Sequence, residues 1–236
     1  MIRLATIFLL GAGQALAQDS FNLPAGCTGY VTVQKRGCVV SHLFTCQGDP
    51  AGHQRRVDMT EKGLGYIGTI DAETNWVEST HVAAGYTEKL TPDAADPASF
   101  TQLLAAGHDD WHFVTVASDG YSSRNVGTDD ISDRNVVIDG VALQLTDFVI
   151  RVTDPVSGAF LWSAVGHEYI HPDWRTFVSG TRTITTPTET YDSDNSPVEF
   201  AFPGQQGFLS VKPRYDCSEP IAGDMPAVTL VSAIGN

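Results

Sequence analysis

The chain is short of positive charge. Of its 236 residues, 14 are Lys or Arg and 28 are Asp or Glu, which gives a formal net charge of −14 at pH 7. Nucleic acids and anionic membrane surfaces attract an excess of Lys and Arg, so this balance argues against both as partners. Beyond residue 17 the sequence also lacks an apolar run long enough to span a bilayer, and we expect a chain that does not cross the membrane.

Several signatures of catalytic and cofactor sites are also missing. The sequence contains no G-x-S-x-G and no P-loop. Its one G-x-G-x-x-G, at residues 63–68, lies within a hairpin pattern and is not followed by a helix signal. No cysteine pair has the C-x₂₋₄-C spacing of a structural zinc site. We therefore expect no cofactor, although a catalytic triad assembled from distant residues is left open.

The first residues have the layout of a secretory signal peptide. Arg3 supplies a positive charge, Ala5–Leu10 form a short apolar run, and the residues at 15–17 make a small-x-small cleavage site. The sequence predicts a signal peptide over residues 1–17 and a single β domain over 18–236. The protein would then act in the periplasm or be secreted.

The cysteines follow the predicted signal and are even in number, which predicts two disulfides in an oxidising compartment. If Tyr30–Gln34 and Val39–Phe44 form a hairpin, Cys27 falls opposite Cys46, and Cys38 is left to pair with Cys217. The alternative, Cys27 with Cys38 and Cys46 with Cys217, fits the spacing nearly as well. The four cysteines are Cys27, Cys38, Cys46 and Cys217.

Alternation of apolar and polar residues dominates the chain, and polar turn clusters separate the alternating segments. This pattern predicts an all-β fold, mainly an antiparallel meander, that forms a barrel, a half-barrel or a sandwich. The predicted strands are Tyr30–Gln34, Cys38–Thr45, Gln54–Thr60, Gly65–Ile70, Asn75–Ser79, Val82–Leu90, Trp111–Ala117, Tyr121–Val126, Asn135–Ile138, Val141–Thr153, Ala159–Ile170, Arg175–Pro187, Pro197–Phe202 and Phe208–Lys212.

One segment, residues 97–106, has the pattern of a short helix. Asp96 can cap it, Pro97 suits the first helical position, and Gly107 follows its end. The apolar stripe that would pack on the sheet consists of Phe100, Leu103 and Leu104.

His167, Glu168 and His171 spell H-E-x-x-H, the signature of zinc peptidases. That motif works on a helix, where both His side chains share one face and reach one ion. Pro172 disfavours a helical conformation at His171, and the aromatic and β-branched residues before the motif are typical of a strand. On a strand the two His would lie about 13 Å apart, with Glu168 on the opposite face. We therefore predict a strand and keep a zinc-dependent hydrolase as the alternative.

No metal site is favoured elsewhere. Besides His167 and His171, the candidates are His108, Asp110 and His112, which would share one face of a strand and offer ligands for a divalent ion. A solvated loop leading into the next strand is the interpretation we favour for that cluster.

Two acidic stretches, 127–135 and 191–199, could hold calcium outside an EF-hand. The second is no EF-hand because Pro197 and Pro203 occupy the positions that need Gly and Glu. Asx-type turns between strands are the interpretation we favour for both stretches. A calcium-stabilised structural domain is therefore the second alternative.

Aromatic residues gather on the two longest predicted strands, where Phe148, Phe160 and Trp162 could face an apolar ligand or simply form the core. With no coherent catalytic set, we expect a non-enzymatic binding or envelope-associated module. Its partner would be an apolar small molecule or an envelope protein.

Overall fold

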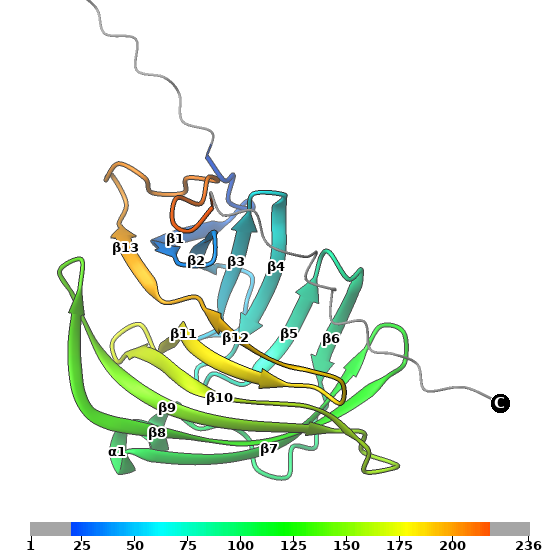
Figure 1. Ribbon diagram of the computed structural model, residues 1–236. Helices are drawn as coiled ribbons and strands as arrows, with labels where there is room; N and C mark the ends of the chain where they lie inside the picture. The colour runs from blue at the N-terminus through cyan, green and yellow to red at the C-terminus, as the bar shows by residue number, and fades with distance from the viewer. Residues whose placement is uncertain (1–19, 218–236) are drawn as a thin grey trace, which may run out of the picture.

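The computed structural model describes residues 20–217, so the predicted signal peptide lies outside the described residues (Figure 1). The described chain forms one antiparallel sheet and one short helix, which confirms the predicted fold class. The elements are β1 (Cys27–Lys35), β2 (Val39–Cys46), β3 (Gln54–Thr60), β4 (Gly63–Ile70), β5 (Trp76–His81), β6 (Tyr86–Leu90), α1 (Phe100–Ala106), β7 (His108–Ala117), β8 (Ser122–Ile138), β9 (Val141–Thr153), β10 (Phe160–His171), β11 (Thr176–Thr185), β12 (Thr190–Asp194) and β13 (Pro197–Ala201).

The sheet has 13 strands in the order β12-β11-β10-β9-β8-β7-β6-β5-β4-β3-β2-β1-β13 and is not closed into a barrel. Its two edge strands nevertheless follow each other in the chain, because only Asn195 and Ser196 separate β12 from β13. Backbone bonds hold this link to both ends of the sheet: Asn195 N donates to Gly180 O (2.9 Å), and Arg36 N donates to Ser196 O (2.9 Å). The sheet therefore curls back on itself while its edges stay unpaired with each other.

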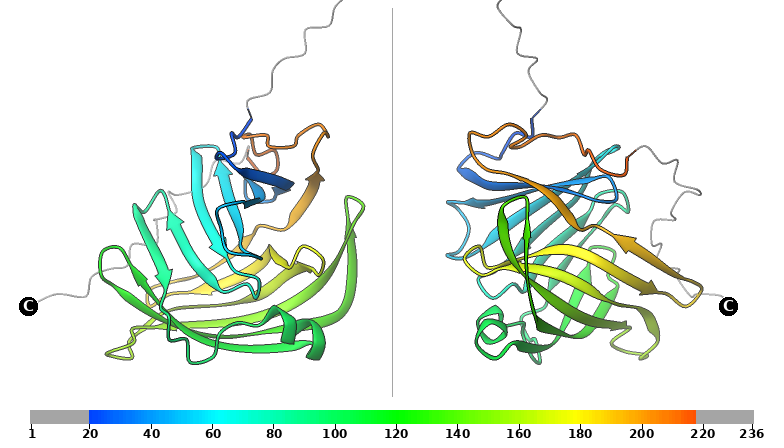
Figure 2. Two further views of the ribbon diagram at one scale, coloured as in Figure 1. Left: turned by 180° about the vertical axis from the view of Figure 1, so that it is seen from behind. Right: turned by 60° about the vertical axis from the view of Figure 1, so that its left-hand side comes forward.

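Because the sheet is strongly curved, its strands form two parts that face each other, which we call its two walls. In Figure 1, β3–β6 rise steeply while β7–β10 run beneath them, and Figure 2 shows the same division from two other sides. Near β13, a buried apolar cluster packs the first strands against the later ones. Its members are Val31, Val33, Leu43, Val141, Leu143, Val178 and Phe200.

The helix forms where predicted but begins later. Its N-cap is Ser99, whose hydroxyl accepts from Gln102 N (3.2 Å), and Gly107 ends it with φ of 77°. The prediction that Asp96 caps the helix is wrong. Asp96 instead forms a backbone bridge with His112, which keeps the chain extended up to the cap.

The strand predictions hold in most places and fail in four. Residues 108–110, for which we favoured a solvated loop, form the start of β7 and pair with β8. Residues 122–138 form one long strand, β8, where two were predicted, because its polar middle stays paired with β9 except for an irregularity between Ile131 and Asn135. Phe208–Lys212 is not a strand and contributes only the bridge of Ser210 to Ser20. β12 was not predicted, because its acidic residues were interpreted as a turn or calcium loop.

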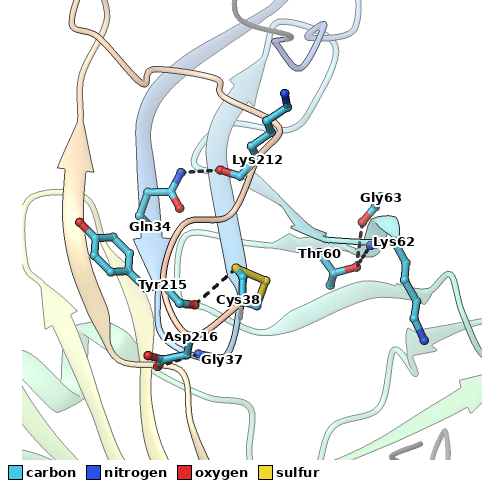
Figure 3. The surroundings of a disulfide bond; sticks show 10 residues. Gln34, Gly37, Cys38, Thr60, Lys62, Gly63, Lys212, Tyr215 and Asp216 are labelled. Atoms are coloured by element: carbon cyan, nitrogen blue, oxygen red, sulfur yellow. Dashed lines mark hydrogen bonds between the residues drawn. A yellow bond between two sulfur atoms is a disulfide. The ribbon is translucent and has the colours of Figure 1, made fainter. Parts of the chain in front are cut away.

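The disulfides are Cys27–Cys46 and Cys38–Cys217, which confirms the first of the two predicted pairings. The second bond fastens the C-terminal segment to the first hairpin (Figure 3). Nearby, Gln34 Nε2 donates to Lys212 O (3.0 Å) and Cys38 N donates to Tyr215 O (2.9 Å). Two disulfides indicate folding in an oxidising environment. No helix in the described part of the chain is long and apolar enough to cross a membrane.

Candidate functional site

The two walls of the sheet border a partly open cavity of about 490 Å³, lined by side chains from β1 to β11. Its lining is unusual for a plain core because aromatic and charged residues share it. The aromatic residues are Tyr30, Tyr66, Trp76, Trp111, Phe113, Phe148, Trp162 and Phe177. The charged or titratable residues include Arg56, Asp58, His81, Glu88, Asp129, Glu168 and Arg182.

Three rings form a compact cluster on β5 and β7. The centroid of Trp76 lies 5.9 Å from that of Trp111 and 5.3 Å from that of Phe113, and the last two lie 5.3 Å apart. Trp111 and Phe113 are buried, whereas Trp76 is 39% exposed. Trp76 therefore retains ring surface that a ligand could cover, with Trp111 and Phe113 fixing it from behind.

Trp111 is held in place from β8. Its Nε1 donates to Asp129 Oδ2 (2.9 Å), and Gly127 is its direct cross-strand neighbour. A Cβ on Gly127 would lie 2.4 Å from the Trp111 ring and 2.4 Å from the Val149 carbonyl oxygen. Only glycine leaves the indole room to lie across β8.

We expect Gly127→Ala to lower the free energy of unfolding by about 1–3 kcal/mol, because the added methyl group must displace either the indole or the backbone of β9. Urea unfolding at pH 7 measures the change. Gly48→Ala, at an exposed turn where a Cβ meets nothing within 4 Å and the glycine φ is not positive, is the control for an added methyl group. An alanine at 127 that changes neither stability nor tryptophan fluorescence would contradict the proposed packing.

A charged group lies around β3. Asp58 Oδ1 is 3.6 Å from Lys35 Nζ and 3.4 Å from Arg56 Nε, and it accepts a hydrogen bond from Ser41 Oγ (2.5 Å). Lys35 Nζ also donates to Ser179 Oγ (3.2 Å). Burial lowers the pKa of Lys35 to about 8, although Asp58 opposes the shift. Burial alone would raise the pKa of Asp58, but the charges of Arg56 and Lys35 outweigh it and lower that pKa.

Two cations here keep unused donors. The guanidinium carbon of Arg56 lies 4.8 Å from the centroid of the Tyr66 ring. Arg56 Nε is buried and, among the described residues, forms an ion pair but no hydrogen bond. Arg182 is exposed on β11 and has neither a side-chain hydrogen bond nor an ion pair within residues 20–217. Both side chains line the cavity and can donate to a bound molecule.

Two acids complete the lining. Glu168 makes no side-chain hydrogen bond or ion pair in the described part of the chain, and burial raises its pKa while Arg182, Arg56 and Lys35 oppose the shift. Burial also raises the pKa of Asp129 to about 7, and the negative charge of Glu168 adds to that shift. The carboxyl groups thus lie near each other in a poorly solvated space.

A second set of polar side chains, on β4–β7, forms hydrogen bonds within the protein. Tyr66 Oη and Ser79 Oγ are 2.9 Å apart, and His81 Nε2 lies 3.0 Å from Glu88 Oε1. Thr115 Oγ1 donates to Glu88 Oε2 (2.9 Å). Because each of these contacts is made within the protein, this group places no requirement on a ligand.

The H-E-x-x-H segment lies in β10, as predicted, and not on a helix. Glu168 lines the cavity, whereas His167 is exposed and bonds through Nδ1 to Asp147 of β9. His171 stacks on Trp174 with centroids 3.8 Å apart. The three residues do not converge on one point, so this geometry provides no support for a zinc-dependent hydrolase.

The other metal candidates are not gathered into a ligand set. His108 is exposed and lies 2.7 Å from Asp130 Oδ1 and 3.2 Å from Asp110 Oδ2, whereas His112 forms the backbone bridge described above. Across the described residues, the one close trio of metal-type ligand atoms is Cys38, Glu61 and Cys217, and its two sulfurs are bonded to each other.

The acidic stretches considered for calcium are engaged in the sheet. In the second stretch, Asp192 accepts from Thr183 Oγ1 (2.6 Å), and Asp194 accepts from Ser196 N (2.9 Å) and pairs with Arg36. In the first, Asp129 faces the cavity and Asp130 pairs with His108. Among the described side chains, neither stretch forms a cage of carboxylates.

Of the three aromatic candidates, Phe148 and Trp162 line the cavity and Phe160 does not. A register shift between Phe160 and Trp162 breaks the alternation, and Phe160 lies beneath Arg151, whose guanidinium carbon is 4.7 Å from its ring centroid. Sequence reasoning missed Trp76, Arg56, Asp58 and Arg182. The one local signal was the run of polar residues on both faces of 54–60, which a simple half-buried strand would not need.

This arrangement is suited to binding. An aromatic cluster and a charged group with unused donors and acceptors line the same space, and neither serine of the lining, Ser79 or Ser179, is hydrogen-bonded to a histidine. The chain matches no protein-family model, no curated protein and no solved structure.

Proposed function

We propose that this protein is a non-enzymatic binding module that holds one small amphipathic molecule in the cavity of the curved sheet. The observation that carries the proposal is the composition of the cavity, about 490 Å³ lined by an aromatic cluster and by charged groups, of which Glu168 and Arg182 form no hydrogen bond or ion pair among the described side chains. Cavities of roughly 300–1,000 Å³ with a few placed polar groups are typical of small-molecule sites.

The charged lining argues for an amphipathic ligand over a wholly apolar one. An apolar molecule would displace water from Arg56, Glu168 and Arg182 and offer nothing in return, which is costly for charged groups. A ligand with an apolar body and one polar end would cover Trp76 and still satisfy those groups. The site of action under this proposal is the periplasm or the extracellular space, where the two disulfides persist.

Native mass spectrometry of the full chain tests the proposal directly, because a retained molecule would appear as a fixed added mass. A dye supplies a second test that does not depend on copurification. 8-Anilinonaphthalene-1-sulfonate combines an apolar ring system with one charged group, and its fluorescence rises in a dry site.

We expect Trp76→Ala to weaken binding of this dye about tenfold, because the substitution removes the exposed ring of the aromatic cluster. Isothermal titration calorimetry measures the affinity without relying on tryptophan emission. Tyr121→Ala is the matched control, since Tyr121 is also an exposed aromatic residue (46%) but does not line the cavity. Binding that is absent, or that responds equally to both substitutions, would refute the proposed function.

A further inference from the structure

Two cations from distant parts of the sequence, Arg56 and Arg182, line the cavity, and a third, Lys35, shares Asp58 with Arg56. Lys35 lies on β1, Arg56 on β3 and Arg182 on β11. The positive charges of Arg56 and Arg182 both act on Lys35, and all three cations act on Glu168. In a chain with a formal charge of −14, the gathering of these three positive charges around Glu168 is not explained by composition.

The acids nearby do not form ion pairs with all of these cations. Asp58 pairs with Lys35 and Arg56, and no acid in the described residues lies within ion-pair distance of Arg182. Glu168 lies outside ion-pair distance of all three cations. Among the described residues Arg182 forms no ion pair, and neither arginine forms a side-chain hydrogen bond, so both guanidinium groups keep unused donors.

We propose that the ligand is an organic anion whose single oxyanionic head group binds between Arg56 and Arg182, with its apolar body against Trp76, Trp111 and Phe113. This proposal rests on the proposed function and narrows it to a ligand class. A guanidinium group presents parallel N–H donors that match the oxygen atoms of a carboxylate, sulfonate or phosphate.

The charge of Glu168 affects how strongly this site would bind an anion. A charged carboxylate beside the head group would repel it, whereas a protonated carboxyl can donate a hydrogen bond to it. The charged groups that act on Glu168 are Lys35, Arg56, Arg182 and, through mutual repulsion, Asp129. A neutral side chain of the same size at position 168 should therefore strengthen anion binding.

Two dyes with the same ring system separate charge from shape. 8-Anilinonaphthalene-1-sulfonate and N-phenyl-1-naphthylamine differ in the sulfonate, so the second is a neutral version of the first. We expect the full chain to bind the sulfonate at least tenfold more tightly than the neutral dye. Arg182→Gln should weaken the sulfonate about tenfold and leave the neutral dye unchanged, and Glu168→Gln should strengthen the sulfonate several-fold.

Arg134→Gln is the matched control, because it removes the same charge from an exposed position outside the cavity and should change neither affinity. The opposite directions expected for Arg182→Gln and Glu168→Gln cannot both arise from partial unfolding. If Trp76-dependent binding persists but both dyes bind equally and ignore Arg182→Gln, the anion inference is wrong and the binding function stands. If neither dye responds to Trp76→Ala, the binding function itself fails.

Discussion

Replacing Cys38 and Cys217 together by alanine is expected to lower the free energy of unfolding by about 5 kcal/mol. The bond joins residues 179 positions apart, so it removes a large amount of chain entropy from the unfolded state. It also holds the C-terminal segment over the first strands, where Leu209 N donates to Thr32 Oγ1 (2.8 Å). Urea unfolding of the wild-type and double-alanine chains under oxidising conditions measures the loss.

The other disulfide bond, Cys27–Cys46, provides the internal control. Cys27–Cys46 spans only 19 positions between adjacent strands, and its double-alanine variant should lose about 3 kcal/mol in the same chain-entropy model. The order of the two losses matters more than either value. A larger loss from the short loop would show that local strand pairing, and not the constraint on the unfolded chain, determines what these bonds contribute.

Most of the fold could be predicted because the patterns that define its strands lie within short segments of the sequence. Alternation along each strand identified most of the sheet, and the hairpin pattern placed Cys27 opposite Cys46, the pairing that the structure contains. The failures are also local: Asp96 resembles a helix cap, but a backbone bridge to His112 holds it in an extended conformation. Tertiary pairing overrode the capping signal at that position.

The cavity could not be predicted in the same way. Its charged lining includes residues of β3, β10 and β11, and no periodicity within one strand shows which strands face each other across a curved sheet. Register shifts add to the difficulty, since one of them separates Phe160 from Trp162 and leaves only Trp162 in the cavity. Of the H-E-x-x-H motif, the residue that reaches the cavity is Glu168, and the neighbouring histidines are incidental to it.

The ionisation of Asp129, which lines the cavity, makes the free energy of unfolding depend on pH. Burial raises its pKa from the ordinary value of 3.8 to about 7, the charge of Glu168 adds to the shift, and the hydrogen bond from Trp111 opposes it. A carboxyl group whose pKa is raised by folding stabilises the folded state only while it is protonated. That contribution is complete below about pH 4 and is lost as the pH rises through 7.

Asp129→Asn is therefore expected to be more stable than the wild type by about 2–4 kcal/mol at pH 8 and nearly equal to it at pH 4. Asparagine keeps an oxygen that can accept the Trp111 N–H and cannot ionise, so the substitution removes the buried charge and little else. Urea unfolding of both chains at pH 4, 6 and 8 gives the difference as a function of pH. Asp119→Asn, at an exposed turn, removes the same formal charge and should show no such dependence. A difference for Asp129→Asn that stays constant from pH 4 to pH 8 would mean that this carboxyl titrates normally, and that the cavity is better solvated than its lining indicates.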